Sequence, residues 1–484
     1  MKHKSKRVQR SACSGLTQFA TYYQQAQNTR LSNFMRFIVE TFVHCLGFYR
    51  VSISLSLRLY KQTYIYVQNL GRLADVIALM CELWSSEDGG KIVSQPILID
   101  SLIPPLQKLW ETFGDQNTCT FPVMDCLTRL IGCVGQSAHF QTHYARTLFH
   151  YSLQLACRLN HQQIEFEKVQ KQHNVDEEKM DPPNLEYWAS SLDMLAGLCE
   201  KAQPIFTKIT FDDASTKVKL IKMLNCAIKE KNSMVKGSAL GLLGHLISHC
   251  TNAIEPHVGQ LMLQCIDNLR PNCSLACMNA SWCIGMGLDK YGAKMNALGE
   301  VLFFFFLKIL EKLVQILKAD KGKVDDEIKS NVAITLSRLA KTFFQEIVRL
   351  WDKFAVDWIK ALTLFPEDED KVNAFETLLR IIAEKPKVIV DHQGLPALFA
   401  AICSWEKPPQ KLRNGFVQTL CLFKKAADDW PSALKSIDDK KLVEQVLEKY
   451  NFNFSSSCCF MSSFLFPIGF INFFLYSQWN YFVF

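Results

Sequence analysis

The order of apolar and polar residues is helical from about residue 100 to about residue 450. Apolar residues recur at spacings of three and four, and strand-like alternation is rare. Five segments in this region resemble one another: GSALGLLGHL, MNASWCIGMG, SNVAITLSRL, VNAFETLLRI and RNGFVQTLCL. Each opens at or near a polar residue, usually Asn, and then becomes an apolar helix. The pattern indicates an internal repeat.

The repeat has a period of about forty residues. Taking Ser238, Asn279, Asn331, Asn373 and Asn414 as equivalent gives steps of 41, 52, 42 and 41 residues. About forty residues per helix pair is the period of HEAT and armadillo arrays. The sequence therefore predicts an all-α fold, a HEAT-repeat solenoid in which helix pairs of about 40 residues stack into a right-handed superhelix.

Three apolar runs depart from this pattern. VSISLSLRL (51–59) interrupts the N-terminal helices, VLFFFFLKI (301–309) contains the excess of the 52-residue step, and residues 451–484 form an apolar tail. We interpret these runs as intron-derived sequence in a gene model, an interpretation that transcript sequencing would settle. If they are real, an apolar addition of this kind must leave the helical stack somewhere.

The tail has an alternative interpretation as a membrane anchor. Cys458 to Tyr476 is apolar and nearly long enough to cross a bilayer. Pro467, Gly469 and Asn472 interrupt the run, and no basic cluster follows it. We therefore favour a tail that is disordered or artefactual.

The domain organisation follows from these observations. We expect partial HEAT repeats in residues 1–100, a HEAT array in residues 101–450 with a loop near 162–185, and a tail that does not belong to the array in residues 451–484.

Composition narrows the class of protein. The chain is 49% hydrophobic and 21% charged, as is typical of a globular protein. The net charge of +7 is modest and no basic stripe is visible, so we expect no direct nucleic-acid binding. Eighteen cysteines lack any Cys-x-x-Cys pair, and we interpret them as reduced, buried, small apolar residues of an intracellular protein. The acidic clusters at 176–178 and 367–370 are typical of solvated loops and, less often, of docking surfaces for a basic partner.

Catalytic and metal-binding chemistry is not apparent. No acid, base and nucleophile occur in a recognisable arrangement, so we do not expect an enzyme or a cofactor. His245 and His249 are four residues apart, with Cys250 and His257 nearby, so a zinc site is conceivable. We favour two histidines near a helix end and expect no metal.

A long helical array without catalytic residues is typical of a binding surface. In CMNASWCIG, one tryptophan stands among small residues that let helices pack closely. We expect Ala280, Cys283 and Ile284 to face neighbouring helices. Trp282 lies on another helical face, where it either anchors a partner or fills space between repeats.

The motifs CMNASWCIG, SNVAITLSRLAK, LLGHL, SLDMLAGLCE and PPLQKLW…FPVMDCL together resemble the C-terminal half of the transportins, the karyopherin-beta-two nuclear import receptors. The resemblance runs in order from residue 5 to residue 450, apart from the runs at 51–59 and 301–309. It implies a HEAT superhelix that carries cargo between cytoplasm and nucleus.

Members of this family bind extended cargo signals that contain a hydrophobic or basic segment and, later, a proline–tyrosine pair. RNA-binding proteins are typical cargoes, nucleoporins are further partners, and the Ran GTPase releases cargo by binding the N-terminal half. A complete receptor is about twice as long as this chain. The resemblance therefore implies a truncated form without the Ran-binding repeats, which Ran should not switch.

Seven residues carry over as expected cargo contacts. Trp282 matches a tryptophan on the concave face, which favours its role as an anchor, and Ile334 and Phe121 match apolar contacts. The acidic residues Asp193, Glu200, Asp125 and Asp75 match acidic positions suited to Arg or Lys of a signal.

At three positions this sequence differs from the pattern of cargo-contact residues in the family. His245 stands where the family has an aspartate, Gln68 replaces another acidic residue, and Ser274 replaces an apolar one, so we expect weaker or shifted preference for basic cargo. Two other function classes stay open: a HEAT scaffold for a multiprotein assembly, and a membrane-tethered helical protein. A scaffold should not need Trp282 and Glu200 to project together.

Overall fold

The computed structural model describes residues 5–25, 35–58, 63–86, 95–113, 120–171, 182–295, 300–320, 322–391, 394–426, 430–435 and 437–450. Over these residues the regular structure consists of helices without a strand, so the predicted all-α class is confirmed. Contacts divide the chain into two units, residues 1–377 and 378–484. The division falls inside helix α19.

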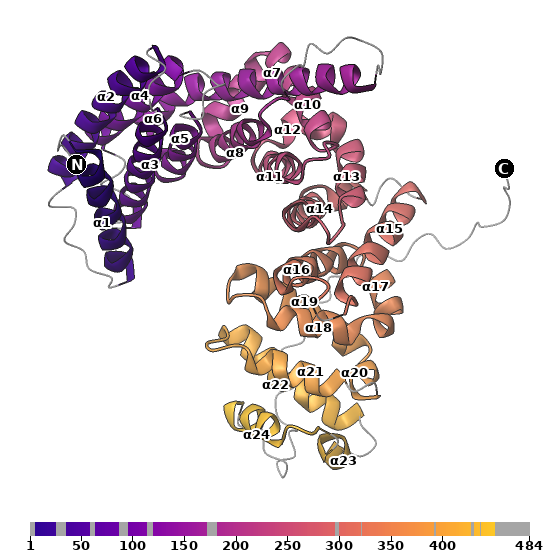
Figure 1. Ribbon diagram of the computed structural model, residues 1–484. Helices are drawn as coiled ribbons and strands as arrows, with labels where there is room; N and C mark the ends of the chain where they lie inside the picture. The colour runs from indigo at the N-terminus through magenta and orange to yellow at the C-terminus, as the bar shows by residue number, and fades with distance from the viewer. Residues whose placement is uncertain are drawn as a thin grey trace, which may run out of the picture. The chain divides into compact units, whose positions relative to one another are not determined.

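Unit 1 contains a row of helices, here called row A, in which each member packs against the next (Figure 1). Row A consists of α1 (Lys6–Gln25), α3 (Thr63–Ser86), α5 (Thr120–Val134), α8 (Leu185–Lys201), α11 (Ser233–His249), α14 (Ser274–Met295) and α16 (Asp326–Thr342).

A second set of helices, row B, pairs with row A. It consists of α2 (Met35–Arg58), α4 (Pro96–Phe113), α7 (Arg146–Lys171), α10 (Ala214–Ala227), α13 (Val258–Asp267) and α15 (Glu300–Leu317). Each packs against the row A helix that follows it in the chain. Stacked helix pairs are the architecture of a HEAT-repeat solenoid, which is the fold that the sequence predicted.

Short helical segments connect the rows. They are α6 (Ala138–Phe140), a π-helical turn (Gln141–Ala145), α9 (Gln203–Asp212), α12 (Thr251–Ile254), a 3-10 turn (Glu255–His257), α17 (Phe344–Leu350), a second 3-10 turn (Trp351–Lys353) and α18 (Ala355–Thr363). Of these, α18 packs against α16 and α15, and α9 packs against α8 and α7.

Unit 2 is a smaller set of helices. After α19 (Glu369–Glu384), which contains the division, it comprises α20 (Lys387–Asp391), α21 (Gly394–Cys403), α22 (Gln410–Ala426), α23 (Trp430–Lys435) and α24 (Lys440–Lys449). Helix α21 packs against α20 and α24, while α22 packs against α20 and α23.

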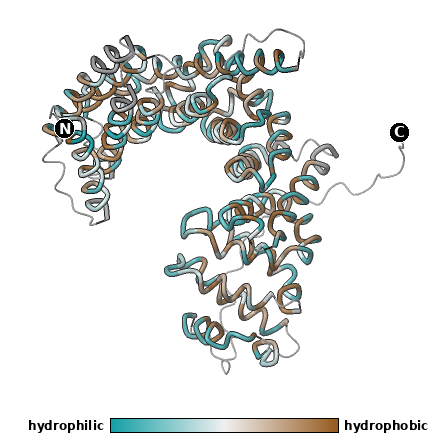
Figure 2. The backbone as a smooth tube through the Cα atoms, in the orientation of Figure 1, coloured by the Kyte–Doolittle hydropathy of each residue, from teal (hydrophilic) through white to brown (hydrophobic). Residues whose placement is uncertain are grey.

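Local sequence explains where the row A helices begin and which face they bury. The side chains of Asn184 and Asn232 each accept hydrogen bonds from two backbone N–H groups and cap α8 and α11. Apolar residues such as Leu195 and Leu243 are fully buried between neighbouring helices. Hydrophobic and hydrophilic residues accordingly alternate along the coils of each helix (Figure 2).

The predicted repeat register is confirmed in unit 1. Ser238, Asn279 and Asn331 fall on α11, α14 and α16, three successive members of row A. The side-chain amide of Asn279 donates to the Gly237 carbonyl at 2.8 Å and thereby ties the two repeats together. The long 52-residue step is associated with a long row B helix, because α15 has 18 residues whereas α13 has 10.

The prediction of a loop near residues 162–185 is partly wrong. Helix α7 continues to Lys171, well into the segment 162–185 that we expected to be a loop. Helix-forming residues fill this stretch, and Lys168 pairs with Glu165 at 2.8 Å across one turn. Residues 172–181 lie outside the described part of the chain.

The three apolar runs that depart from the repeat differ in where they lie in the structure. Residues 51–58 prolong α2, and residues 301–309 form the first half of α15. Phe306 is buried, with its ring centroid 4.9 Å from that of Phe343, so this part of the run packs within the stack. The tail 451–484 lies outside the described residues. Among those that are described, no helix has the length and apolar character needed to cross a membrane.

Candidate protein-binding surface

Three of the predicted contact residues form a line of carboxylates across row A, here called the acidic row. Asp75 lies on α3, Asp125 on α5 and Asp193 on α8, and all three side chains are exposed. Asp125 is close enough to both others to repel them electrostatically. In the described part of the chain none of the three forms an ion pair. The acidic row therefore offers negative charge to an external cation.

The surroundings of the acidic row alter proton binding. Burial among α5, α8 and α11 raises the pKa of Asp193 to about 6, and repulsion by Asp125 adds to this, while a hydrogen bond with Ser238 opposes it. Water still reaches part of the Asp193 side chain, because that side chain is exposed. Burial also raises the pKa of Asp75, although the Arg129 charge lowers it.

Arg129 of α5 is committed to a neighbouring helix and does not neutralise the acidic row through a direct ion pair. Its Nε and Nη2 atoms donate to the two carboxylate oxygens of Glu82 on α3, at 2.7 and 3.0 Å. This two-point contact raises the pKa of Arg129 and fixes the spacing of α3 and α5.

Trp282 of α14 occupies the surface directly over Gly244 of α11. A Cβ atom placed on Gly244 would overlap Cζ3 and Cε3 of the indole and lie 2.8 Å from its Cη2 atom. The side chain of Trp282 is half-buried, whereas Ala280, Cys283 and Ile284 are fully buried, as predicted. The small residues thus pack between the helices, and the glycine leaves room for the one large ring. Whether that ring anchors a partner stays a prediction.

His245 lies near both this tryptophan and Glu200, and the three residues are here called the indole cluster. The His245 ring meets the Trp282 ring edge-on, with centroids 5.0 Å apart. Glu200 of α8 lies 3.9 Å from His245 Nε2 and 2.6 Å from Lys201 Nζ. Burial lowers the pKa of His245 against the opposing effect of Glu200, so the imidazole is neutral at pH 7. Glu200 therefore shares its charge mainly with Lys201.

The two remaining predicted contacts differ in their accessibility. Phe121, near the start of α5, is 37% exposed and its ring centroid lies 6.2 Å from that of Tyr187. Ile334 of α16 is only 6% exposed, because its side chain packs inside the array. Phe121 can contact a partner, whereas Ile334 has almost no surface to offer and serves packing.

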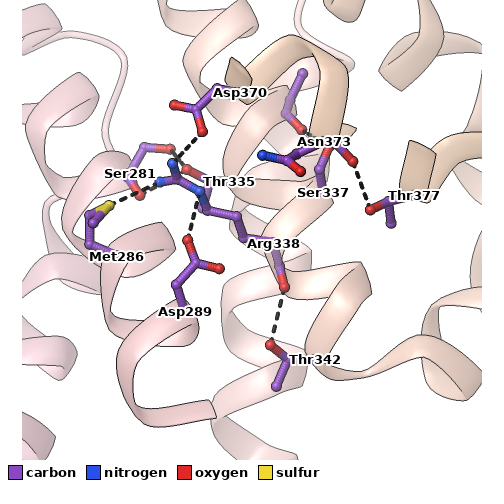
Figure 3. Close-up of polar contacts among 11 residues, drawn as sticks. Ser281, Met286, Asp289, Thr335, Ser337, Arg338, Thr342, Asp370, Asn373 and Thr377 are labelled. Carbon is purple, nitrogen blue, oxygen red and sulfur yellow. Dashed lines mark hydrogen bonds and ion pairs between the residues drawn. The ribbon is translucent and has the colours of Figure 1, made fainter. Parts of the chain in front are cut away.

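A buried arginine that the sequence did not single out joins three helices beyond the indole cluster (Figure 3). Arg338 of α16 pairs with Asp289 of α14 at 3.0 Å and with Asp370 of α19 at 2.7 Å. Its side chain is 14% exposed and also contacts the Met286 sulfur. Gly285 makes this approach possible, because a Cβ there would lie 2.9 Å from the guanidinium.

The acidic cluster at 367–370 is consequently more than the solvated loop that we expected. Asp370 accepts from Arg338, and the Asp368 carboxylate accepts from the backbone N–H of Lys371 at the start of α19. The Arg338–Asp370 pair joins residues 32 positions apart, and therefore local pattern gave no sign of it. A glycine at position 285, which leaves room for the guanidinium, is the local cue to this site.

His245 and His249 lie side by side with ring centroids 6.1 Å apart. No group of three potential ligands suited to a metal ion occurs among the residues that the structure describes. The histidines belong to the last turns of α11, where we expected them.

The amino-acid sequence is similar to those of transportins and of importin subunit beta-2. No protein-family model matches it. Transportin-1 of Mus musculus is 24% identical over 425 residues, which cover 88% of this chain and 42% of that protein. Transportin of Dictyostelium discoideum is 24% identical over 93% of this chain and 43% of its own. Importin subunit beta-2 of Schizosaccharomyces pombe is 24% identical over 68% of this chain.

Solved karyopherin structures overlay on this chain with low TM-scores and low sequence identity. Importin beta covers 94% of the chain with a TM-score of 0.49 and 12% identity. Kap121p bound to Pho4p covers 93% with a TM-score of 0.43 and 10% identity. The assignment of the fold rests on the packed helix pairs described above and not on these overlays.

The chain spans about two fifths of the length of the transportins that it matches, near the half that the motifs implied. The ordered motifs and the similarity over 88% of the chain agree. The chain is therefore similar to the transportins over most of its own length.

Proposed function

We propose that this chain binds cargo proteins as part of a transportin-like nuclear import receptor. The acidic row would contact basic residues of an extended cargo signal, and Trp282 would provide an apolar anchor further along. The signal class expected from the resemblance is a hydrophobic or basic segment followed by a proline–tyrosine pair. The observation that carries the proposal is the line of three exposed carboxylates, which form no ion pair with any residue that the structure describes, on a chain similar to transportins.

The arrangement suits an extended peptide better than a folded domain. The carboxylates lie on three successive helices of row A, so a chain that crosses the helices meets one after another. Exposed charge pairs contribute only about 0.2–1 kcal/mol each, and specificity then comes from several contacts in a fixed order. A half-buried indole adds an apolar contact that salt does not screen.

A salt titration of peptide binding tests the electrostatic part. Fluorescence anisotropy would compare the full chain with an Asp125→Asn/Asp193→Asn variant, using a labelled basic peptide that ends in proline–tyrosine. We expect the double variant to bind about two- to thirtyfold more weakly at low ionic strength, with the difference shrinking near 1 M salt. Asp212→Asn is the matched control, because Asp212 is an exposed carboxylate on α9, outside row A.

The alternatives give different results. Equal affinity of both variants and the wild type would remove the acidic row from the proposal. A helical, folded chain that does not bind the peptide at all would favour the scaffold interpretation.

A further inference from the structure

Two cysteines from different helices of row A lie in contact at one end of the α8–α11 pair. Cys199 is in the last turn of α8 and Cys250 directly follows α11. Their sulfur atoms are 3.7 Å apart, with the Cys199 thiol donating to Cys250. The Thr207 hydroxyl of α9 lies 3.2 Å from the same Cys250 sulfur. Three elements thus converge on one sulfur atom.

The electrostatic setting of Cys250 differs from that of other cysteines in the array. Burial raises the pKa of Cys126, Cys277 and Cys283. For Cys250 the hydrogen bond from Cys199 lowers the pKa, the contact with Thr207 lowers it further, and burial opposes both. The thiolate is the reactive form of a cysteine, and two donors that stabilise it favour reaction at Cys250.

We infer that Cys199 and Cys250 are a thiol-oxidation site, at which a hydroperoxide converts the pair reversibly into an intramolecular disulfide. The sulfur atoms need only close from 3.7 Å to about 2.05 Å. Both side chains are buried, with 0% and 3% of their surface exposed, so a small oxidant is the suitable reagent and a bulky one is excluded.

The reaction balances as a two-electron oxidation. The Cys250 thiolate attacks one oxygen of the hydroperoxide and the O–O bond breaks, so that a sulfenic acid forms and an alkoxide or hydroxide leaves, which takes up a proton from water to become an alcohol or water. The Cys199 thiol then attacks the Cys250 sulfur, its proton passes to the departing hydroxide, and water leaves as the S–S bond forms. The two sulfurs are oxidised and the peroxide is reduced, and a dithiol reductant reverses the step.

The disulfide would add a covalent link at the ends of two row A helices that otherwise associate through packing and through polar contacts such as that between Asp193 and Ser238. Glu200 follows Cys199 in the chain, and His249 precedes Cys250, so the link lies beside the indole cluster. The inference concerns the chemistry of the two cysteines and stands without the proposed cargo binding.

A second pair of touching cysteines provides an internal control. Cys265 of α13 and Cys283 of α14 also share a hydrogen bond, but both are 0% exposed. The Cys283 thiol donates to the Leu240 carbonyl at 3.0 Å, and burial raises its pKa. The Cys283 thiol is therefore held in its protonated form, and we expect this pair to stay reduced under conditions that oxidise the first pair.

Peptide mapping of the full chain tests the inference directly. The folded chain would be treated with hydrogen peroxide, alkylated under denaturing conditions and digested with a protease that cleaves after glutamate. Residues 187–200 then contain Cys199 as their one cysteine, and residues 231–255 contain only Cys250. We expect a crosslinked pair of these peptides that appears before any disulfide within residues 256–300, and that a dithiol reductant removes.

Variants distinguish a tuned site from accidental proximity. Thr207→Val keeps the side-chain shape and removes the hydroxyl, so the crosslink should form at least about threefold more slowly. Cys199→Ser should leave Cys250 as a sulfenic acid that a dimedone probe traps. The inference is overturned if the native chain forms no such crosslink while half-exposed Cys133 and Cys157 are oxidised, or if the Cys265–Cys283 pair oxidises equally fast. Circular dichroism would establish that each variant is folded.

Discussion

The close approach of α14 to α11 depends on the absence of a side chain at Gly244, and Gly244→Ala tests this dependence. The added methyl group would overlap two ring atoms of Trp282 and lie 2.8 Å from a third. Carbon atoms not bonded to each other are comfortable only at about 3.5 Å or more. The indole must therefore move outward, or the two helices must separate.

The magnitude follows from two opposing effects. Overpacking a well-filled site costs about 1–3 kcal/mol. Replacing glycine by alanine inside a helix stabilises the helix by about 1 kcal/mol. We expect Gly244→Ala to lower the free energy of unfolding by up to about 2 kcal/mol. Shortening the indole in a Gly244→Ala/Trp282→Leu variant should recover most of this loss, because the overlapping ring is gone.

Urea unfolding followed by circular dichroism measures the effect, and Gly241→Ala is the matched control. Gly241 lies one turn earlier on α11, where a Cβ would meet only the Asn279 amide nitrogen at 3.3 Å. This control should be neutral or slightly stabilised. If Gly244→Ala were as stable as Gly241→Ala, or if the double variant were no better than the single one, the packing argument would be wrong.

Three further predictions follow from individual contacts. The pKa of Asp193 rises from 3.8 to about 6 on folding, so the contribution of this carboxyl to stability is fully present below about pH 4 and is lost as the pH rises through about 6. Asp193→Asn should therefore make the urea midpoint less dependent on pH over that range, and an unchanged pH profile would refute the shift. Arg338→Gln should cost about 1.5–3 kcal/mol of unfolding free energy, because Asp289 and Asp370 lose a charged donor, whereas a loss below about 0.5 kcal/mol would show that water replaces it. Asn232→Ala should cost about 1 kcal/mol through the lost α11 cap, and Asn232→Asp, which keeps the acceptor, should not.

The helical class and the repeat register were predictable because each rests on local pattern. Apolar spacing identifies the buried face of a helix, and the recurring polar residue, which lies five positions after the start of α11, α14 and α16, sets the register. Ser238, Asn279 and Asn331 fall on successive row A helices for this reason. Helix ends were less predictable, and α7 extends to Lys171, into the expected loop, where Lys168 pairs with Glu165 across one turn.

The candidate surface was only partly predictable from sequence. The acidic row and Phe121 are exposed, and their contact with a partner stays a prediction. The burial of Ile334 depends on neighbouring helices that local sequence does not specify. The Arg338–Asp370 and Cys199–Cys250 contacts join residues 32 and 51 positions apart, respectively. Such long-range contacts come from the stacking of repeats, and spacing along one helix cannot reveal them.

The most direct test of the central claim is the affinity of the full chain and its Trp282→Ala variant for a labelled peptide with a basic segment and a proline–tyrosine pair. If Trp282 anchors a cargo signal, its removal should cost about 2 kcal/mol, or about thirtyfold in Kd, while circular dichroism stays unchanged. Equal affinity of the two folded proteins would contradict the account and leave Trp282 as a residue that fills space between α11 and α14.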